Sequence, residues 1–266
     1  MSAFDLTDRV AIVTGGGGTE HGVGSAIAIA LADAGASIVV AGRDTGHLEP
    51  VSTALQQKGA RSLAVPCDVT DPDQCANLIA TTTKEFGRLD ILVNNAASTQ
   101  KGDPLELTPE QWRESIDVNL NGVFFCCQAA ARHMVAKGSG HIVNIASSSG
   151  IKGDEFMAPY AAAKAAVINL TKRLAARLVK DDILVTGIAP GAFASEMNKA
   201  ARDLGDIVGQ HVPAGRIGND EDMAGVAIYL ASRAGNYVVG ETIAVDGGVV
   251  HAFLTESWEV DPSGGH

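Results

Sequence analysis

Tyr160 and Lys164 are the two side chains in this sequence whose spacing most directly suggests chemistry. They lie four residues apart in a helical pattern, so they share one face of a helix. A free tyrosine has a pKa of about 10, which is too high for easy proton exchange at neutral pH. A neighbouring ammonium group favours the phenolate and lowers that pKa. The pair predicts a tyrosine that gives or takes a proton, although Tyr–Lys pairs on protein surfaces are also common.

The stretch TGGGGTEHGVG, from Thr14 to Gly24, is a second candidate for chemistry because six of its residues are glycine. It lies between the apolar run 10–13 and the helix-like run 25–31. A strand, a glycine turn and a helix in this order can bind a dinucleotide, because backbone N–H groups and the positive end of the helix meet the pyrophosphate. A glycine-rich turn alone is weak evidence for such a site.

Short apolar runs alternate with helical patterns along the rest of the chain. The predicted strands are Val10–Thr14, Ser37–Ala41, Ser62–Pro66, Ile91–Asn94, His141–Ala146, Leu184–Ile188 and Thr242–Val245. The predicted helices are Gly24–Ala34, Glu49–Lys58, Pro72–Phe86, Thr108–Lys137, Pro159–Lys180 and Asp220–Leu230. Several strands are apolar at consecutive positions, as in a parallel sheet buried on both faces. The alternation predicts right-handed βαβ units and a doubly wound α/β fold.

Composition restricts the possible partners. The 266 residues carry a net charge of −11, which argues against nucleic acid or an anionic membrane as a partner. The four cysteines form no CxxC pair, so free thiols are expected and no metal site is predicted. The sequence shows neither a signal peptide nor a membrane span, which favours a soluble, cytoplasmic protein. We expect one domain over residues 1–250 and a tail, 251–266, that is partly disordered or packed on a neighbouring subunit.

Several motifs together resemble the short-chain dehydrogenase/reductase family in its short single-domain form. They are Thr14-Gly15…Gly22-Val23-Gly24, Asn94-Asn95-Ala96-Ala97, Ser147, Tyr160-Ala161-Ala162-Ala163-Lys164, Pro190-Gly191 and Val245-Asp246-Gly247-Gly248. The resemblance spans about residues 6 to 250. It implies a Rossmann-type three-layer α/β/α fold with a mostly or fully parallel seven-stranded sheet. It also implies hydride transfer between a nicotinamide cofactor and a ketone or secondary alcohol.

The resemblance assigns four catalytic residues: Asn119, Ser147, Tyr160 and Lys164. Ser147 would hold the substrate oxygen beside Tyr160, and both would stabilise a developing alkoxide. Asn119 would help to position a water that relays protons to the lysine, or it could simply pair with backbone within its helix. Enoyl reductases of this fold typically place six residues between the tyrosine and the lysine, so the three found here favour carbonyl–alcohol chemistry.

The predicted cofactor is NADP(H). Gly42 stands where NAD-preferring relatives carry an acid, and Arg43 after it can fork onto a 2′-phosphate. NAD(H) stays possible if Asp44 accepts from the ribose instead. Six residues separate Gly15 from Gly22 where the family usually has three, and we expect this longer loop to carry His21 toward the phosphate. The full set of expected cofactor contacts is Gly15, Gly17, His21, Gly22, Val23, Arg43, Asp68, Val69, Asn95, Ala96, Tyr160, Lys164, Pro190, Gly191, Phe193 and Ser195.

A mainly apolar pocket with one polar contact is expected for the substrate. Its predicted walls are Ser149, Ile151, Glu155, Phe156, Phe193 and Met197, together with a mobile segment, Asn198–His211. A small ketone or alcohol fits best, while an NAD-dependent alcohol or polyol dehydrogenase stays an alternative. A 3-oxoacyl-thioester reductase acting on coenzyme A or acyl-carrier-protein esters is another. The acidic Lys180-Asp181-Asp182 loop disfavours an acidic carrier protein.

Two further expectations concern assembly and class. The family usually associates through its two long helices, here Thr108–Lys137 and Pro159–Lys180, and the small residues Ala161–Ala163 permit close packing. A homotetramer is therefore expected. A module that senses NADP without turnover is the alternative from another class, but the complete catalytic set argues against it.

Overall fold

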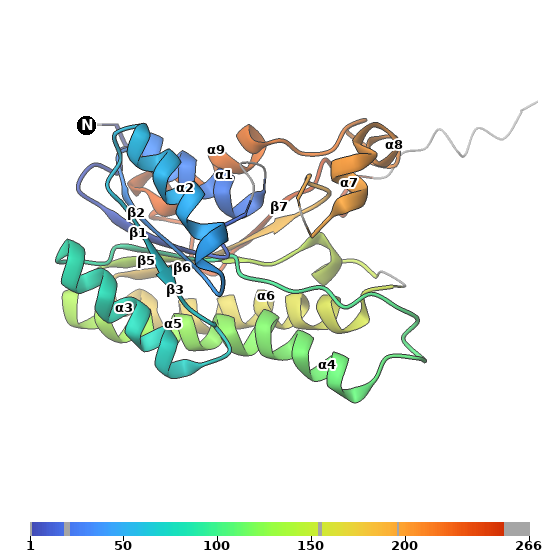
Figure 1. Cartoon of the computed structure of the whole chain (residues 1–266), viewed down its shortest axis with the longest axis horizontal. Helices are drawn as coiled ribbons and strands as arrows, with labels where there is room; N and C mark the ends of the chain where they lie inside the picture. Colours follow the sequence, from blue (N-terminus) through green and yellow to red (C-terminus); the bar gives the residue numbers. More distant parts are fainter. Residues whose placement is uncertain (1, 19–21, 154–155, 196, 253–266) are drawn as a thin grey trace, which may run out of the picture.

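The computed structural model describes residues 2–18, 22–153, 156–195 and 197–252. Its centre is one seven-stranded sheet in the order β3-β2-β1-β4-β5-β6-β7 (Figure 1), and every neighbouring pair of strands is parallel. The strands are β1 Val10–Thr14, β2 Ser37–Gly42, β3 Ser62–Pro66, β4 Ile91–Asn94, β5 Gly140–Ile145, β6 Ile183–Pro190 and β7 Thr242–Val245. The predicted doubly wound α/β fold with a fully parallel sheet is confirmed.

Helices cover both faces of the sheet and make three layers (Figure 1). Their bounds are α1 Val23–Asp33, α2 Thr45–Gln57, α3 Pro72–Phe86, α4 Pro109–Ile116, α5 Gly122–Lys137, α6 Ala158–Leu178, α7 Lys199–Asp203, α8 Gly205–Gly209 and α9 Asp220–Ala231. One apolar core lies between the sheet and α3, α5 and α6, and the other lies under α1, α2 and α9. Both faces of the strands are buried, which explains their continuous apolar runs.

The predicted helix Thr108–Lys137 differs from the structure. A π-turn at Asp117–Asn121 separates α4 from α5, so the run is helical throughout but not regular. The extra residue in a π-turn shifts the register of the helix faces. Asn119 lies in this turn and is fully buried, so the irregularity coincides with a predicted site residue.

The structure also differs from the sequence-based prediction in the bounds of other segments. Helix α2 begins four residues before the predicted Glu49, because the Asp44 side chain caps it by accepting from the Gly46 N–H at 2.8 Å. The segment predicted to be mobile, Asn198–His211, contains the short helices α7 and α8. No helix in the described part of the chain is long and apolar enough to cross a bilayer. The boundary between a domain at 1–250 and a tail at 251–266 stays a prediction, since residues 253–266 lie outside that part.

Candidate active site

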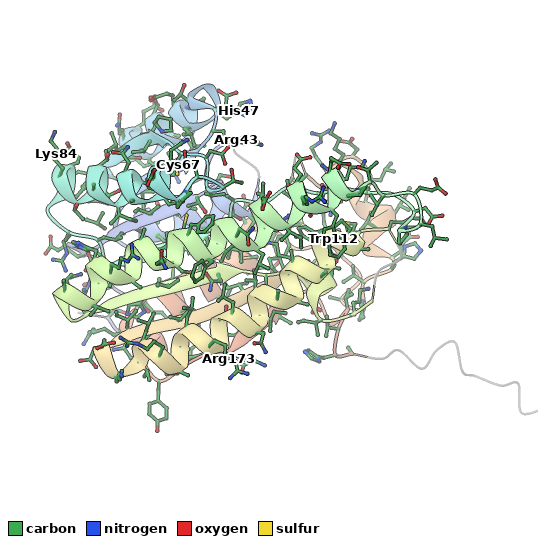
Figure 2. The ribbon with its side chains drawn as sticks, turned by 90° about the horizontal axis from the view of Figure 1, so that it is seen from below. Arg43, His47, Cys67, Lys84, Trp112 and Arg173 are labelled. Carbon is green, nitrogen blue, oxygen red and sulfur yellow. The ribbon has the colours of Figure 1, made fainter. Side chains whose placement is uncertain are left out.

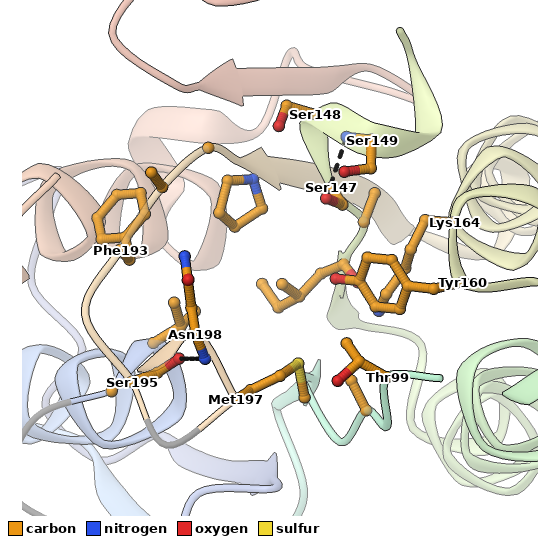
Figure 3. Close-up of a pocket in the computed structure, with 18 of the residues that line it drawn as sticks. Thr99, Ser147, Ser148, Ser149, Tyr160, Lys164, Phe193, Ser195, Met197 and Asn198 are labelled. Carbon is orange, nitrogen blue, oxygen red and sulfur yellow. Dashed lines mark hydrogen bonds between the residues drawn. The ribbon is translucent and has the colours of Figure 1, made fainter. Parts of the chain in front are cut away.

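A cleft of about 510 Å³ opens at the carboxyl ends of the central strands, where open parallel sheets bind their ligands. The loops after β1, β4, β5 and β6 contribute to its walls, and Figure 3 shows the part around Tyr160. Twelve of the predicted catalytic and cofactor residues line it: Gly15, Gly17, Gly22, Val23, Asn95, Ser147, Tyr160, Lys164, Pro190, Gly191, Phe193 and Ser195. Residues far apart in the sequence are thus brought to one cavity.

The glycine loop fits tightly against its surroundings. Gly15 has a φ of 61°, and a Cβ there would lie 2.7 Å from the Ala96 Cα. Gly17 packs on the first turn of α2, where a Cβ would lie 2.8 Å from the carbonyl oxygen of His47, and the next N–H, of Gly18, donates to that oxygen at 2.9 Å. The lengthened loop therefore rests on α2. His21, the residue expected to reach a phosphate, lies outside the described residues.

The amino end of α1 is open toward the cleft. Its N-cap is Gly22, and no side chain caps it. By contrast, Asp71 caps α3, Thr108 caps α4 and Asn219 caps α9. No acidic residue stands in the first turn of α1 either. Uncapped N–H groups and the helix dipole make this end a fitting site for a phosphate.

Arg43 and Asp44 have different surroundings at the end of β2. Arg43 is exposed and, within the described residues, makes no hydrogen bond or ion pair; Figure 2 shows it near His47 at the start of α2. Asp44 is already engaged, because it caps α2 and its other carboxylate oxygen lies 3.8 Å from His47 Nδ1. A free guanidinium beside an engaged carboxylate fits a 2′-phosphate better than a 2′-hydroxyl group.

The predicted cofactor residues Asp68, Val69, Asn95 and Ala96 lie in the loops around the cleft. The Asp68 carboxylate accepts from the Thr70 N–H at 3.0 Å, and Val69 is buried beside it. Asn95 Nδ2 donates to the Gly15 carbonyl oxygen at 2.8 Å, and the Ala96 N–H donates to the Thr14 hydroxyl at 3.1 Å. Asp68, Val69 and Ala96 are not among the residues that line the cleft. Their bonds show a structural role, and a contact with the cofactor stays a prediction.

Ser147, Tyr160 and Lys164 meet at the floor of the cleft (Figure 3). Ser147 follows β5, and its Oγ accepts from the Ser149 N–H at 3.1 Å, which starts a short 3₁₀ turn. Tyr160 and Lys164 project from the first two turns of α6, with Lys164 Nζ 5.6 Å from the centre of the tyrosine ring. Ser147 lies close enough to Tyr160 for its side chain to favour a lower pKa of the phenol, which agrees with the predicted register, in which Ser147 rather than a neighbouring serine faces the tyrosine.

The pKa of Tyr160 is raised, and the sequence-based expectation of a lowered pKa is wrong for the ligand-free protein. Burial opposes the phenolate, and the hydrogen bond with Ser147 only partly offsets that effect. The lysine does not reverse the shift because it points to a backbone carbonyl rather than to the phenol. The hydroxyl group therefore carries its proton at neutral pH.

Lys164 is a buried cation that has no carboxylate partner among the described residues. Its side chain is 1% exposed, and Nζ donates to the carbonyl oxygen of Ile145 at 2.7 Å. Burial lowers its pKa to about 8 because the low dielectric disfavours the charged form. An ammonium held in this way retains donors for other oxygens, such as the hydroxyl groups of a ribose.

Asn119 is bonded at both ends of its amide. Its Nδ2 donates to the carbonyl oxygens of Ser98 and Ser115, each at 2.8 Å, and its Oδ1 accepts from the Ser98 N–H at 3.2 Å. It therefore fastens the loop after β4 to the π-turn. This is the backbone pairing considered as its alternative role, and Asn119 does not line the cleft.

The outer end of the cleft differs in part from the prediction. Ser149, Phe193 and Met197 line it, whereas Ile151 and Phe156 are exposed and do not, and Glu155 lies outside the described residues. Ser195 holds the turn before α7, because its Oγ accepts from the Asn198 N–H at 3.0 Å. The lining residues that sequence reasoning missed include Thr99, Lys101, Lys152, Met157, Val212 and Val249. Most of them stand a few positions beyond a recognised motif, which is the only signal that could have found them.

Comparisons with known proteins agree on the class of fold and site. Residues 16–250 match the sequence family described as enoyl-(acyl carrier protein) reductase. Gluconate 5-dehydrogenase of Gluconobacter oxydans (strain 621H) is 36% identical over 249 residues, which cover 92% of this chain and 96% of that protein. A 3-oxoacyl-(acyl-carrier-protein) reductase of Synechocystis sp. is 38% identical over 247 residues, covering 92% and 98%. The crystal structure of a gluconate 5-dehydrogenase from Burkholderia cenocepacia J2315 in complex with NADP and tartrate has a TM-score of 0.88 at 37% identity, covering 94% and 98%.

Proposed function

The chain belongs to the short-chain dehydrogenase/reductase family, and on that premise we propose that it is an NADP(H)-dependent enzyme interconverting a ketone and a secondary alcohol. That it is an NAD(P)-dependent oxidoreductase acting on CH–OH groups follows from its relatives. The observation that carries the finer proposal is the meeting of Ser147, Tyr160 and Lys164 in one cleft with the glycine loop and the open end of α1.

The residues of the site support a simple division of labour. When bound, the nicotinamide supplies or accepts the hydride. Tyr160 carries its proton at neutral pH, so in the reductive direction its hydroxyl group donates that proton to the oxygen of the former carbonyl. Ser147 donates a hydrogen bond to the same oxygen and stabilises the developing alkoxide. Lys164 binds the ribose hydroxyls and, as a cation, stabilises the Tyr160 phenolate that is left once the proton has been donated.

The chain's own residues favour NADP over NAD. The Arg43 guanidinium, which has no partner among the described residues, and the engaged Asp44 carboxylate both support recognition of a 2′-phosphate. The Burkholderia cenocepacia relative binds NADP, which agrees with this choice. The proposed phosphate contact adds one or two charge-assisted hydrogen bonds, and we expect these to separate the two cofactors by about 10- to 100-fold in affinity.

Turnover is the direct test of the proposed function. Purified protein is incubated with NADPH and a panel of cyclic, linear and sugar-derived ketones, and the decrease in NADPH absorbance is followed. We expect Tyr160→Phe to abolish reduction without a change in the melting temperature. Tyr237→Phe is the matched control, because Tyr237 is fully exposed and does not line the cleft. A Tyr160→Phe protein as active as the wild type would refute the catalytic assignment.

Cofactor choice needs a separate measurement. Thermal shifts are compared for NADPH and NADH on the wild type and on Arg43→Ser, with the exposed Lys84→Ser as control. We expect the wild type to prefer NADPH and the Arg43 variant to lose that preference while it keeps its shift with NADH. An equal loss of both shifts would show that Arg43 supports the fold and not phosphate recognition.

A 3-oxoacyl-thioester reductase is the second candidate, because the Synechocystis relative has that activity by name. The acidic loop Lys180-Asp181-Asp182 opposes docking of an acidic carrier protein. Kinetic comparison of a 3-oxoacyl thioester with the free ketones separates the two candidates. Reduction of the thioester with a much higher kcat/KM would favour the second.

We also propose that the protein forms a homotetramer through α5 and α6 and that it is cytoplasmic. Phe124 and Val135 on α5 are exposed apolar side chains, and Ala162 and Ala165 expose a small-residue surface on α6. Such a face suits close helix packing between copies. Light scattering that gives the mass of a monomer would contradict the tetramer.

A further inference from the structure

The charged residues of the cleft are unusual for so acidic a chain. The described residues that line it include Lys101, Lys152 and Lys164 together with His211, but no aspartate or glutamate. The protein as a whole carries 31 acidic and 20 basic residues, so a cleft whose described lining has lysines and no carboxylate runs against the average. Lys164 is accounted for by the proposed chemistry, whereas Lys101 and Lys152 are not.

Lys101 and Lys152 have no partner for their charge in the described part of the chain. Neither makes a hydrogen bond or an ion pair there. Elsewhere nearby acids neutralise cations, as Asp33 does for Lys58 and Asp222 does for Arg216. Within the described residues, two ammonium groups at one cleft have no carboxylate at ion-pair distance, so the carboxylate of a ligand can pair with them.

The two lysines come from loops that are joined to each other. Lys101 follows β4, Lys152 follows β5, and the Gly102 N–H donates to the carbonyl oxygen of Phe156 at 3.0 Å. This bond ties the loop after β4 to the loop that leads into α6. Because Lys152 stands five residues after Ser147, it extends the same wall of the cleft outward from the predicted reaction centre.

The cofactor is not a fitting occupant for these lysines. In the sheet order β3-β2-β1-β4-β5-β6-β7, the loops after β4 and β5 lie on one side of β1, and the loop after β2 with Arg43 lies on the other. The open amino end of α1 follows β1 itself and suits the pyrophosphate. The lysines therefore lie on the Tyr160 side of the cleft, where the substrate must sit.

We propose that the substrate is a small oxo or hydroxy acid whose carboxylate is received by Lys101 and Lys152 while its carbonyl carbon faces Tyr160. This inference rests on the proposed function and names the substrate class for it. A cleft of about 510 Å³ accommodates a small acid beside part of the proposed cofactor. Apolar walls from Phe193, Met157 and Met197 then contact the carbon chain between the two polar ends.

Matched pairs of substrates test the charge directly. The pairs are 4-oxopentanoate, 5-oxohexanoate and 4-oxocyclohexanecarboxylate, each compared with its primary amide, which has nearly the same shape without the charge. We expect the acid of at least one pair to have a kcat/KM about tenfold or more above that of its amide, mostly through KM. Raising the ionic strength from 0.05 to 0.5 M should reduce that ratio, because salt screens the charge.

Variants then assign the effect to the lysines. Lys101→Met, Lys152→Met and the double variant keep the length of the side chain and remove its charge. We expect each single change to lower the acid-to-amide ratio severalfold and the double change to bring it near one, while Lys152→Arg restores most of it. Lys180→Met is the control, because Lys180 is exposed and lies outside the cleft, and it should leave the ratio unchanged.

Binding separates failure of this inference from failure of the proposed function. Calorimetry measures 4-oxocyclohexanecarboxylate and its amide against the NADP complex of Tyr160→Phe, which needs no turnover. Tighter binding of the acid that is lost in the double lysine variant supports the carboxylate site even if no ketone is reduced. Equal binding of acid and amide, or a preference that survives the double variant, overturns the site whether or not ketones are reduced.

Discussion

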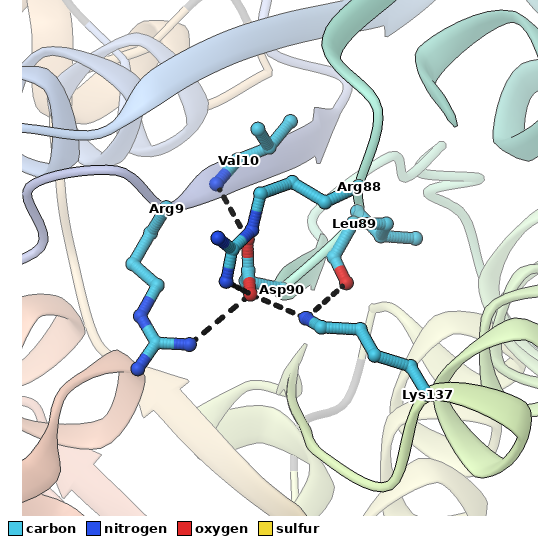
Figure 4. Close-up of polar contacts among 6 residues, drawn as sticks. All are labelled: Arg9, Val10, Arg88, Leu89, Asp90 and Lys137. Carbon is cyan, nitrogen blue, oxygen red and sulfur yellow. Dashed lines mark hydrogen bonds and ion pairs between the residues drawn. The ribbon is translucent and has the colours of Figure 1, made fainter. Parts of the chain in front are cut away.

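Two buried charges at opposite ends of neighbouring strands are treated differently by this fold. Asp90 precedes β4 and is 2% exposed. It contacts Arg9 and Lys137 and takes two hydrogen bonds from Arg88, at 2.7 and 2.8 Å (Figure 4), and its carboxylate also accepts from the Val10 N–H. Lys164 lies beside the carboxyl end of β5 and is as deeply buried. Among the described residues its ammonium group donates a hydrogen bond to a single carbonyl oxygen, that of Ile145.

This difference in bonding indicates that Asp90 serves the stability of the fold, whereas Lys164 is arranged to bind a ligand. At Asp90 the surrounding cations outweigh burial and hold the pKa of the carboxyl group well below its usual range, so the charge is satisfied by the protein itself. At Lys164 burial acts unopposed and lowers the pKa of the ammonium group to about 8. A functional site often carries such an unfavourable arrangement, because the ligand completes it.

The largest effect is expected when the unsatisfied charge is removed. Lys164→Met should reduce turnover by about 10²- to 10⁴-fold, because the site loses its ribose contact and the cation near Tyr160. Its unfolding free energy should stay equal or rise, since an unpaired buried ammonium is replaced by an apolar chain of similar length. Steady-state kinetics and urea unfolding on the same preparation measure both. If Lys164→Met lost stability as well as activity, Lys164 would stabilise the fold as Asp90 does, and the proposed contrast between the two residues would be wrong.

The reverse pattern is expected at the other end of the sheet. Asp90→Asn should lower the unfolding free energy by about 3 kcal/mol, near the small end of the range for breaking a buried ion pair. Arg9, Arg88 and Lys137 are partly exposed and can turn to solvent, which limits the loss. Activity at 20 °C should stay near that of the wild type. Urea unfolding and kcat report the two quantities, and a large fall in kcat of the folded variant would contradict this view.

The pH dependence of stability should differ between the wild type and Lys164→Met. The pKa of Lys164 is about 8 in the folded protein and near 10.5 when unfolded, so in that window the unfolded chain binds more protons. Stability from this group therefore rises with pH, by about 1 kcal/mol between pH 8 and pH 9. Urea unfolding of both proteins at these two values isolates the lysine, because other titrating groups cancel in the difference. If the unfolding free energy of both proteins changed equally with pH, the pKa of Lys164 would not be lowered in the folded protein.

The smallest effect is expected within the Asp90 cluster. Arg9 is 41% exposed and is one of three cations on the carboxylate. Arg9→Met should cost about 0.5 to 1 kcal/mol, because Arg88 and Lys137 remain and solvent screens the exposed member. Thermal unfolding of Arg9→Met and of Asp90→Asn measures the loss of stability in each variant, and the two losses can then be compared. A cost equal to that of the aspartate variant would show that the cluster depends on all its members.

The sequence was sufficient for the sheet, because strands buried on both faces read as continuous apolar runs. Ser147, Tyr160 and Lys164 were named through the family resemblance, and the structure brings them to one cleft, while their catalytic roles stay predictions. The prediction that failed at the site was the direction of the pKa shift of Tyr160. The pKa of Tyr160 depends on how deeply the folded chain buries the ring, and no local pattern carries that information.

Features built from distant segments were not predictable. The π-turn at Asn119 arises in an otherwise regular helical pattern, and within it the Asn119 side chain bonds to the distant loop at Ser98. Lys101 and Lys152 stand in loops without periodicity, so only the folded structure shows that they line the same cleft. The cations around Asp90 include residues 81 and 47 positions away in the chain, and the local sequence Arg88-Leu89-Asp90 gives no hint of them.

The central position of β1 has a consequence for the kinetics of folding. β1 pairs on one side with β2, the next strand in the chain, but on its other side with β4, and Val10 meets Asp90 across 80 positions. Closing so long a loop is entropically costly, and contacts between distant segments slow folding. During synthesis β1 keeps one bare edge until β4 has emerged. Nascent and refolding chains therefore expose an apolar strand edge for longest at the middle of the future sheet, where aggregation is most easily seeded.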